Sequence, residues 1–443
     1  MKVDISGYEG PAARLARGSA VALILYLVAA GLAYLSQLML ARMIGAHGYG
    51  IYAYVLSWVT VLAYVSALGF DVSLLRFVTG YLTTHAFPLL RGIIIYASRR
   101  VAAMGLGISV LAGIGLLTEA RGLPPDLFQT FLVGLVLVPI LALLWISAAV
   151  VRAFGGVVSA LTPDRILRDA FLVLALLICA AEGLRIDAPL AMTVTLLGAG
   201  AGLALVSFSV RRRLTRATIK TIAPVYDAQL WRRAALPLVV IGATDALMNR
   251  TGVLLLSWIA GNREAGIYAL AFNIAFAITL PRTAINALLA PTMSDLFVRN
   301  DRAALQSIIG KTALWTLLGA VVIALPIFIL ARPLLGLCGQ EFETGALALR
   351  ILVIGQVIAA MAGSQLHLMN MTGRERSAAV LIVCSTLALA AVGAALISAL
   401  GVTGAALAAT VALVGWNAAM SVSIWRHLRL LPGMIAARSI ERN

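Results

Sequence analysis

The chain is a succession of apolar stretches, each about 20 residues long, separated by short polar interruptions. About 20 residues of α-helix span the ~30 Å hydrocarbon core of a bilayer. In lipid the backbone satisfies its own hydrogen bonds only as a helix or in a closed barrel, and barrel strands alternate over ~10 residues. The sequence therefore predicts an all-α integral membrane protein. Its twelve expected transmembrane helices lie near 18–40, 49–69, 99–117, 127–150, 166–182, 188–210, 236–260, 265–291, 311–331, 345–371, 377–399 and 403–425.

Composition agrees with this class. Charged residues make up 12% of the chain and hydrophobic residues 62%, whereas a soluble domain averages about 25% charged residues. The sequence thus excludes a soluble enzyme. A formal net charge of +16 would suggest nucleic acid as the partner of a soluble protein. Here the charges lie between the apolar stretches, so we expect membrane lipids and no nucleic acid as partners.

The basic residues are distributed unequally between alternate sides of the predicted helices. One side holds 26 of the 34 Lys and Arg residues, the other side 5, and 3 lie within helices. Because cytoplasmic loops carry the excess of Lys and Arg, this partition supports twelve spans with both termini in the cytoplasm. We expect a multi-pass protein of the bacterial inner membrane.

A short internal repeat divides the chain in two. Residues 45–53 (GAHGYGIYA) recur at 261–269 (GNREAGIYA), 216 positions later and without a gap. Six predicted helices separate the copies, so both have the same orientation across the membrane. The repeat predicts two parallel six-helix lobes, residues 1–215 and 216–443, around a central cavity.

Several short segments, taken in order, resemble a known family. They are 40–45 (LARMIG), 50–53 (GIYA) and 74–77 (LLRF) in the first half, and 249–250 (NR), 280–281 (LP), 370–376 (NMTGRER) and 401–408 (GVTGAALA) in the second. Their order and spacing resemble the polysaccharide transporter family, the O-antigen and exopolysaccharide repeat-unit flippases. These belong to the multidrug/oligosaccharidyl-lipid/polysaccharide exporter superfamily, with its MATE-like fold. Many relatives have Asp where this chain has Asn249, which weakens any ion role attached to that position.

The resemblance implies that the chain moves an undecaprenyl-pyrophosphate-linked oligosaccharide from the inner to the outer leaflet. Such a substrate needs a protein, because burying a hydroxyl without a partner costs roughly 1–3 kcal/mol and each charge at the bilayer centre costs ~3 kcal/mol or more. The resemblance also implies polysaccharide polymerase or ligase partners.

Ionisable residues within the apolar stretches are candidates for the site, since they are costly in lipid. Arg250 lies near the middle of the seventh predicted helix, and Arg282 lies in the eighth. We expect both guanidinium groups to bind the pyrophosphate, because their paired donors match phosphate oxygens. The alternative is a structural ion pair with Asp245. Since Asp245 and Arg250 are five residues apart, direct pairing between them is awkward.

Further candidates are less specific. Arg350 suits either the substrate or the membrane interface, and Arg42 and Arg76 lie at predicted helix ends. Polar neutral side chains either bind sugar hydroxyls or join helices; those chosen as site candidates are Asn249, Gln356 and Gln37. His367 is a proton-relay candidate or a satisfied core residue. No cofactor, catalytic residue or metal site is expected.

Three other functions compete with transport of a lipid-linked sugar. A cation-coupled multidrug exporter of the same superfamily needs carboxylates in its cavity, and the first half shows no acidic residue deep in a predicted helix. A membrane polymerase or ligase would place reactive groups on a long outer loop, and the expected outer loops are short. The third is a non-transporting scaffold of a polysaccharide-synthesis complex.

Overall fold

The computed structural model describes residues 11–216, 219–283, 285, 296, 301–363, 365–371, 375–428, 430–431 and 433. Every regular element within these ranges is helical, which confirms the predicted all-α class. The longer elements are α1 (Pro11–Ala67), α2 (Phe70–Thr83), α3 (Phe87–Thr118), α4 (Pro125–Ala153), α6 (Arg168–Ala181), α7 (Ala188–Arg216), α8 (Ala228–Ile259), α9 (Asn262–Phe276), α11 (Arg302–Ile329), α13 (Ala346–Ala362) and α15 (Glu375–Leu428).

The shorter elements connect or extend these helices. They are α5 (Val157–Leu161), the π-helix η1 (Thr162–Leu167), the 3-10 helices η2 (Ile219–Thr221), η3 (Ala277–Thr279) and η4 (Gln340–Gly345), α12 (Ala331–Gly336) and α14 (Gln365–Met371).

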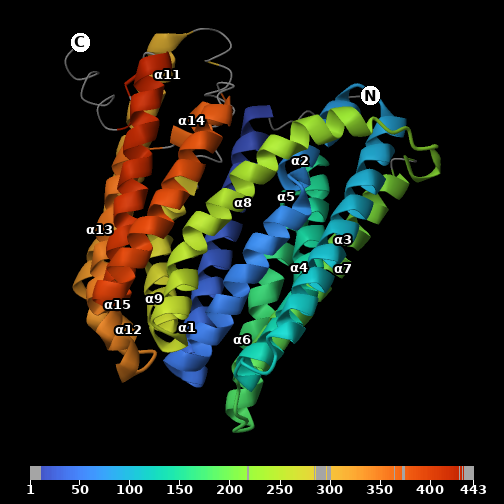
Figure 1. Cartoon of the computed structure of the whole chain (residues 1–443). Coiled ribbons are helices and arrows are strands. Elements are labelled where there is room, and N and C mark those ends of the chain that lie inside the picture. The colour runs from blue at the N-terminus through green and yellow to red at the C-terminus, as the bar shows by residue number, and fades with distance from the viewer. Residues whose placement is uncertain are drawn as a thin grey trace, which may run out of the picture.

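The two longest helices each fold back on themselves at a glycine. In α1 the backbone leaves helical geometry at Gly45, and in α15 at Gly401. The Tyr49 hydroxyl hydrogen-bonds Gln37, 12 residues away, whereas a straight helix would separate them by ~18 Å. Figure 1 shows the dark and lighter blue parts of α1 running beside each other. Both glycines have positive φ, a backbone conformation that residues with a Cβ atom rarely adopt.

The described helices account for twelve passes. Nine are long and apolar enough to span a membrane, and two of these, Leu27–Thr83 and Ser377–His427, contain the reversals at Gly45 and Gly401. The remaining pass runs through α5, η1 and α6, where the π-helix interrupts the α-helix.

Several helices extend past their apolar stretches. The third pass begins at Phe87 rather than near 99, and the fifth at Val157 rather than near 166. Arg99, Arg100 and Arg168, which stand at the starts of the predicted helices, therefore lie well inside the observed ones. The ends of an apolar stretch thus mark the edges of the hydrocarbon core, and the helix itself continues past them into the polar region.

The helices gather on two sides of the molecule. Figure 1 shows α11 to α15 on one side and α2 to α7 on the other, with α1, α8 and α9 between them. One core of buried residues runs through both sides, from Leu40 in α1 to Ala406 in α15. The two sides are therefore in direct contact over part of their height.

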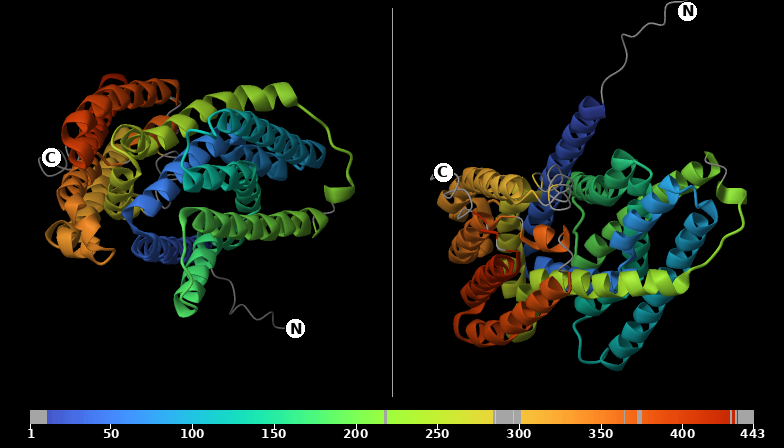
Figure 2. Two further views of the ribbon diagram at one scale, coloured as in Figure 1. Left: turned by 60° about the horizontal axis from the view of Figure 1, so that its bottom comes forward. Right: turned by 90° about the horizontal axis from the view of Figure 1, so that it is seen from above.

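Helix α8 crosses from one side to the other, as both views in Figure 2 show. At its start Trp231 is buried in a cluster with α2 and α3, and its indole N–H donates to the Tyr81 hydroxyl over 3.0 Å. The segment before α8 lies on the start of α3, where the Val225 N–H donates to the Pro88 carbonyl and Arg91 donates to the Ile222 carbonyl. The start of the second half of the chain is thus packed on the first half.

Candidate functional site

The two copies of the sequence repeat contact each other backbone to backbone. A Cβ added to Gly50 would lie 1.7 Å from the Asn262 carbonyl oxygen, and one added to Gly266 would lie 2.1 Å from the Ala46 carbonyl oxygen. Asn262 and Gly266 are the repeat equivalents of Ala46 and Gly50. We call this contact, made by Ala46, Gly50, Asn262 and Gly266, the glycine seam. Its reciprocal pattern relates the two copies by a local twofold axis.

A charged side chain also crosses the seam. Glu341 in η4 accepts a hydrogen bond from the Ala46 N–H over 2.6 Å, which satisfies a free donor where the second part of α1 begins. Its other carboxylate oxygen lies 3.6 Å from Arg263.

Nearby, burial raises the pKa of the Cys338 thiol to about 11. The structure is therefore closed at the end of the molecule that carries Gly45 and Gly261.

A polar network starts beside the seam, at the residue that precedes Gly50. Tyr49, fully buried, donates its hydroxyl hydrogen to Gln37 Oε1 over 2.8 Å and accepts a hydrogen bond from Asn273 Nδ2 over 3.0 Å. Gln37 and Tyr49 belong to α1 and Asn273 to α9. The predicted site residue Gln37 thus belongs to a network that joins the two halves of the chain.

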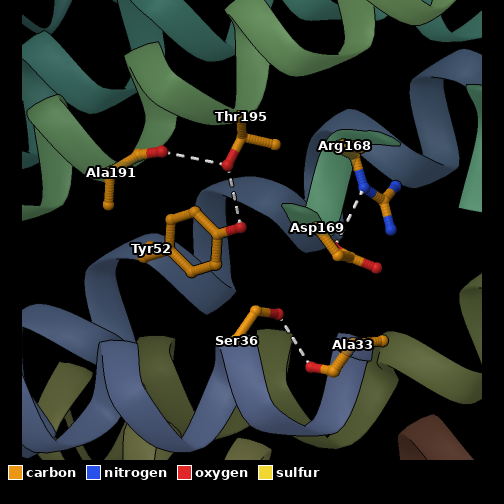
Figure 3. Close-up of polar contacts among 7 residues, drawn as sticks. All are labelled: Ala33, Ser36, Tyr52, Arg168, Asp169, Ala191 and Thr195. Atoms are coloured by element: carbon orange, nitrogen blue, oxygen red, sulfur yellow. Dashed lines mark hydrogen bonds and ion pairs between the residues drawn. The ribbon is translucent and has the colours of Figure 1, made fainter. Parts of the chain in front are cut away.

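Figure 3 shows a second polar group within the first half. The Tyr52 hydroxyl lies 3.1 Å from that of Thr195, and the Thr195 hydroxyl donates to the Ala191 carbonyl, so Tyr52 is the donor between them. Beside them Arg168 Nε lies 3.4 Å from Asp169 Oδ1. The Asp169 residue is only 4% exposed.

The sequence pattern does not single out this pair. Asp169 is an acidic residue well inside the fifth pass, so the expectation that the first half has none deep in a helix is wrong. Pro163 and the nearby charges resemble a loop in sequence, but here they form the π-helix η1. π-Helical turns inside α-helices occur frequently at functional sites, and the sequence gives no other signal of the turn.

Arg250 belongs to α8. It lies within electrostatic range of Tyr49, Tyr52, Tyr64 and Arg168. The residue is partly buried. Among the described residues no carboxylate lies within ion-pair distance of Arg250. The site therefore has an excess of positive charge beside several hydroxyl groups.

Arg282 and Asp245 interact with each other rather than with Arg250. Asn249 donates from Nδ2 to the Asp245 backbone carbonyl over 2.8 Å and lies 3.5 Å from the Asp245 carboxylate. Asn249 also lines a pocket of about 40 Å³ together with Gln356 and Thr410, enough space for one or two waters. The second half thus brings together four predicted site residues: Asp245, Asn249, Arg282 and Gln356.

The remaining predicted arginines lie elsewhere. Arg42 is exposed at the closed end, within electrostatic range of Cys338, and Arg76 is exposed on α2. Arg350 donates from Nε to the Phe328 carbonyl at the end of α11, and its guanidinium lies 5.7 Å from the Phe328 ring centre. Its contacts fit the structural alternative. The His367 side chain lies outside the described residues.

A family model described as polysaccharide biosynthesis protein matches residues 15–297, which is more than half of the chain. This match includes both copies of the repeat and Arg168, Asp169, Arg250 and Arg282. The chain belongs to this family. No curated protein sequence matches the chain.

Solved structures of transporters share the fold of this family member. A multidrug resistance MATE family transporter of the MOP superfamily, in an inward-facing conformation, is 12% identical with a TM-score of 0.71, covering 94% of this chain and 96% of that one. A MOP superfamily transporter from Pyrococcus furiosus, described as having reversed polarity of its binding pocket, is 13% identical with a TM-score of 0.66 and 97% coverage of both chains. A mutant Vibrio cholerae MATE transporter is 17% identical with a TM-score of 0.61, covering 94% and 96%. At these identities the likeness establishes the MATE-like fold alone.

Proposed function

We propose that this protein moves an undecaprenyl-pyrophosphate-linked oligosaccharide from the inner to the outer leaflet of the bacterial cytoplasmic membrane. The observation that carries the proposal is Arg250, a cation in the protein interior with no carboxylate partner among the described residues. A cation in a low-dielectric site favours an anionic ligand. Membership of a polysaccharide biosynthesis family makes a pyrophosphate-linked sugar the fitting anion.

The side chains around Arg250 suit the two parts of such a headgroup. The guanidinium offers paired donors to phosphate oxygens. Tyr64, which packs beside Trp145 and keeps part of its surface accessible, supplies an aromatic face on which a sugar ring packs. The prenyl tail would remain in the lipid, because an apolar chain gains no free energy by moving from lipid into a polar cavity.

Transport would proceed by alternating access between two lobes, residues 1–215 and 216–443. The glycine seam closes the end with Gly45 and Gly261, so the lobes would load substrate from the opposite end and then part at the seam. The charge partition makes the loading end cytoplasmic, with both termini there. Polymerase or ligase partners would then act on the sugar on the outer side.

The test is transport of a fluorescent undecaprenyl-pyrophosphate oligosaccharide in proteoliposomes that contain the purified protein. Arg250→Ala should slow transport about tenfold or more, because a charge-assisted hydrogen bond contributes ~1.5–3 kcal/mol. Arg185→Ala, at an exposed position between α6 and α7, is the matched control and should leave transport unchanged. Normal transport by Arg250→Ala would reject the proposal.

A cation-coupled multidrug exporter is the second candidate, favoured by the MATE-like fold and by the buried Asp169. Mass spectrometry of lipids that co-purify with the protein separates the two. A polyprenyl-pyrophosphate sugar supports the first candidate. Sodium- or proton-driven export of a cationic dye, without such a lipid, supports the second.

A further inference from the structure

The interior holds two arginines from different halves of the chain. Arg250 comes from α8, and Arg168 comes from the fifth pass, at the point where η1 gives way to α6. They lie within electrostatic range of each other and of Tyr52. Two like charges within this range repel each other in the low-dielectric interior. An anion bound between them would remove that repulsion.

Helix packing fixes the backbone of Arg168. A Cβ on Gly198 of α7 would lie 3.1 Å from the Arg168 Cα, and one on Gly202 would lie 2.7 Å from the Pro163 carbonyl oxygen. These glycines bring α7 directly against the π-helical turn and its continuation. The backbone of Arg168 is therefore held in place, whereas its long side chain keeps part of its surface accessible.

The Arg168 side chain keeps 29% of its surface, whereas that of Asp169 keeps 6%. Neighbouring residues on a helix do not face each other, so their contact at 3.4 Å requires the arginine to bend back toward Asp169. Figure 3 shows the two side chains in this arrangement, near Tyr52. The carboxylate is the fixed partner of the pair and the guanidinium the movable one.

We propose that Arg168 is a second ligand for the anionic group that Arg250 binds, and that Asp169 is a positioning residue that holds Arg168 back until the anion arrives. This inference rests on the proposed function. The anion competes with Asp169 for the guanidinium, so substrate binding exchanges an internal ion pair for a contact between the two halves. The empty site thereby keeps one of its two cations neutralised.

The test measures binding of farnesyl pyrophosphate to the purified full-length protein, with farnesol as the uncharged control probe. Arg168→Gln should weaken binding about tenfold, in line with the loss of one charge-assisted hydrogen bond. Asp169→Asn should tighten binding several-fold, because it frees the guanidinium. A purely structural carboxylate would give weaker binding when removed.

The double variant is the decisive measurement. If Asp169 acts through Arg168, Asp169→Asn should have no effect on affinity once Arg168→Gln is present. Arg168→Lys should recover part of the affinity, and Arg185→Gln should leave it unchanged. Equal tightening by Asp169→Asn in both backgrounds would overturn the inference, as would unchanged affinity in Arg168→Gln.

The outcomes also separate this inference from the function on which it rests. Binding by the wild type that is lost in Arg250→Gln but unaffected by Arg168→Gln overturns only the role of Arg168. Failure of the wild type to bind farnesyl pyrophosphate overturns both.

Discussion

The glycine seam and the interior around Arg250 lie at two levels of the same interface, and they are built in opposite ways. At the seam the repeat copies touch through Gly50 and Gly266, with no room for a side chain. Beside the seam the buried Tyr49 side chain joins Gln37 to Asn273, and Arg250 lies within electrostatic range of Tyr49 and of Arg168. The seam depends on the absence of side chains, whereas the interior depends on the charge of particular ones.

This difference has a functional consequence. A backbone contact between glycines has little chemical selectivity, but it separates cleanly, because no side chain has to be withdrawn from a pocket. A charged interior selects its ligand and binds it reversibly through long side chains. Changes at the seam should therefore alter which conformation is populated, and changes in the interior should alter affinity.

The largest effect is expected from a methyl group at the seam. Gly266→Ala places a Cβ 2.1 Å from the Ala46 carbonyl oxygen, and such overpacking costs ~1–3 kcal/mol. Because the clash is with backbone, the cost lies at the upper end of this range and shifts the closed state about a hundredfold toward the open one. Maleimide labelling of Cys338, buried near the seam, should accelerate by a similar factor in a Cys179→Ser, Cys384→Ser background. Gly31→Ala, whose Cβ would meet nothing within 4 Å, should label like the parent.

The next effect concerns the oppositely charged Asp245 and Arg282 in the second half, which interact electrostatically. Arg282→Met leaves Asp245 without its electrostatic partner and should destabilise the protein by about 2 kcal/mol, less than for a fully buried pair because both groups keep accessible surface. Adding Asp245→Asn should recover most of the loss, since no charge is then left unpaired. Thermal unfolding in detergent measures both variants. A double variant no more stable than Arg282→Met would contradict this account.

A smaller effect is expected where the two levels meet. Tyr49→Phe removes the hydroxyl between Gln37 and Asn273 and should weaken the closed state by about 1 kcal/mol. Cys338 labelling should then accelerate about fivefold, which is less than in Gly266→Ala. Tyr54→Phe is the control, because Tyr54 packs edge-on against Phe131 and its ring is retained.

The smallest effect is expected at the charged contact across the seam. Glu341→Gln keeps an oxygen acceptor for the Ala46 N–H but loses the attraction to Arg263, which is half exposed. Such a pair contributes ~0.2–1 kcal/mol, so labelling of Cys338 should rise about twofold. The difference from the parent should vanish in high salt. Glu343→Gln breaks an ion pair with Arg332 away from α1. It should change neither the rate of Cys338 labelling nor its dependence on salt.

Much of the fold follows from the sequence alone. Apolar length predicts the spans, since lipid admits few other backbone arrangements, and the repeat at 45–53 and 261–269 predicts two related halves. Charge in an apolar stretch singled out Arg250, Arg282 and Asp245, because such residues are costly in lipid. These signals are local or repeat at a fixed spacing, so they can be read along the chain.

Other features depend on contacts between residues far apart in the chain. No local pattern shows that Gly50 meets Gly266, that Arg282 rather than Arg250 accompanies Asp245, or that a π-helical turn carries Arg168 and Asp169 into the interior. The hydrophobic effect that defines the spans is non-directional. The partner of each charge is set by how the helices pack, and that packing is decided only in three dimensions.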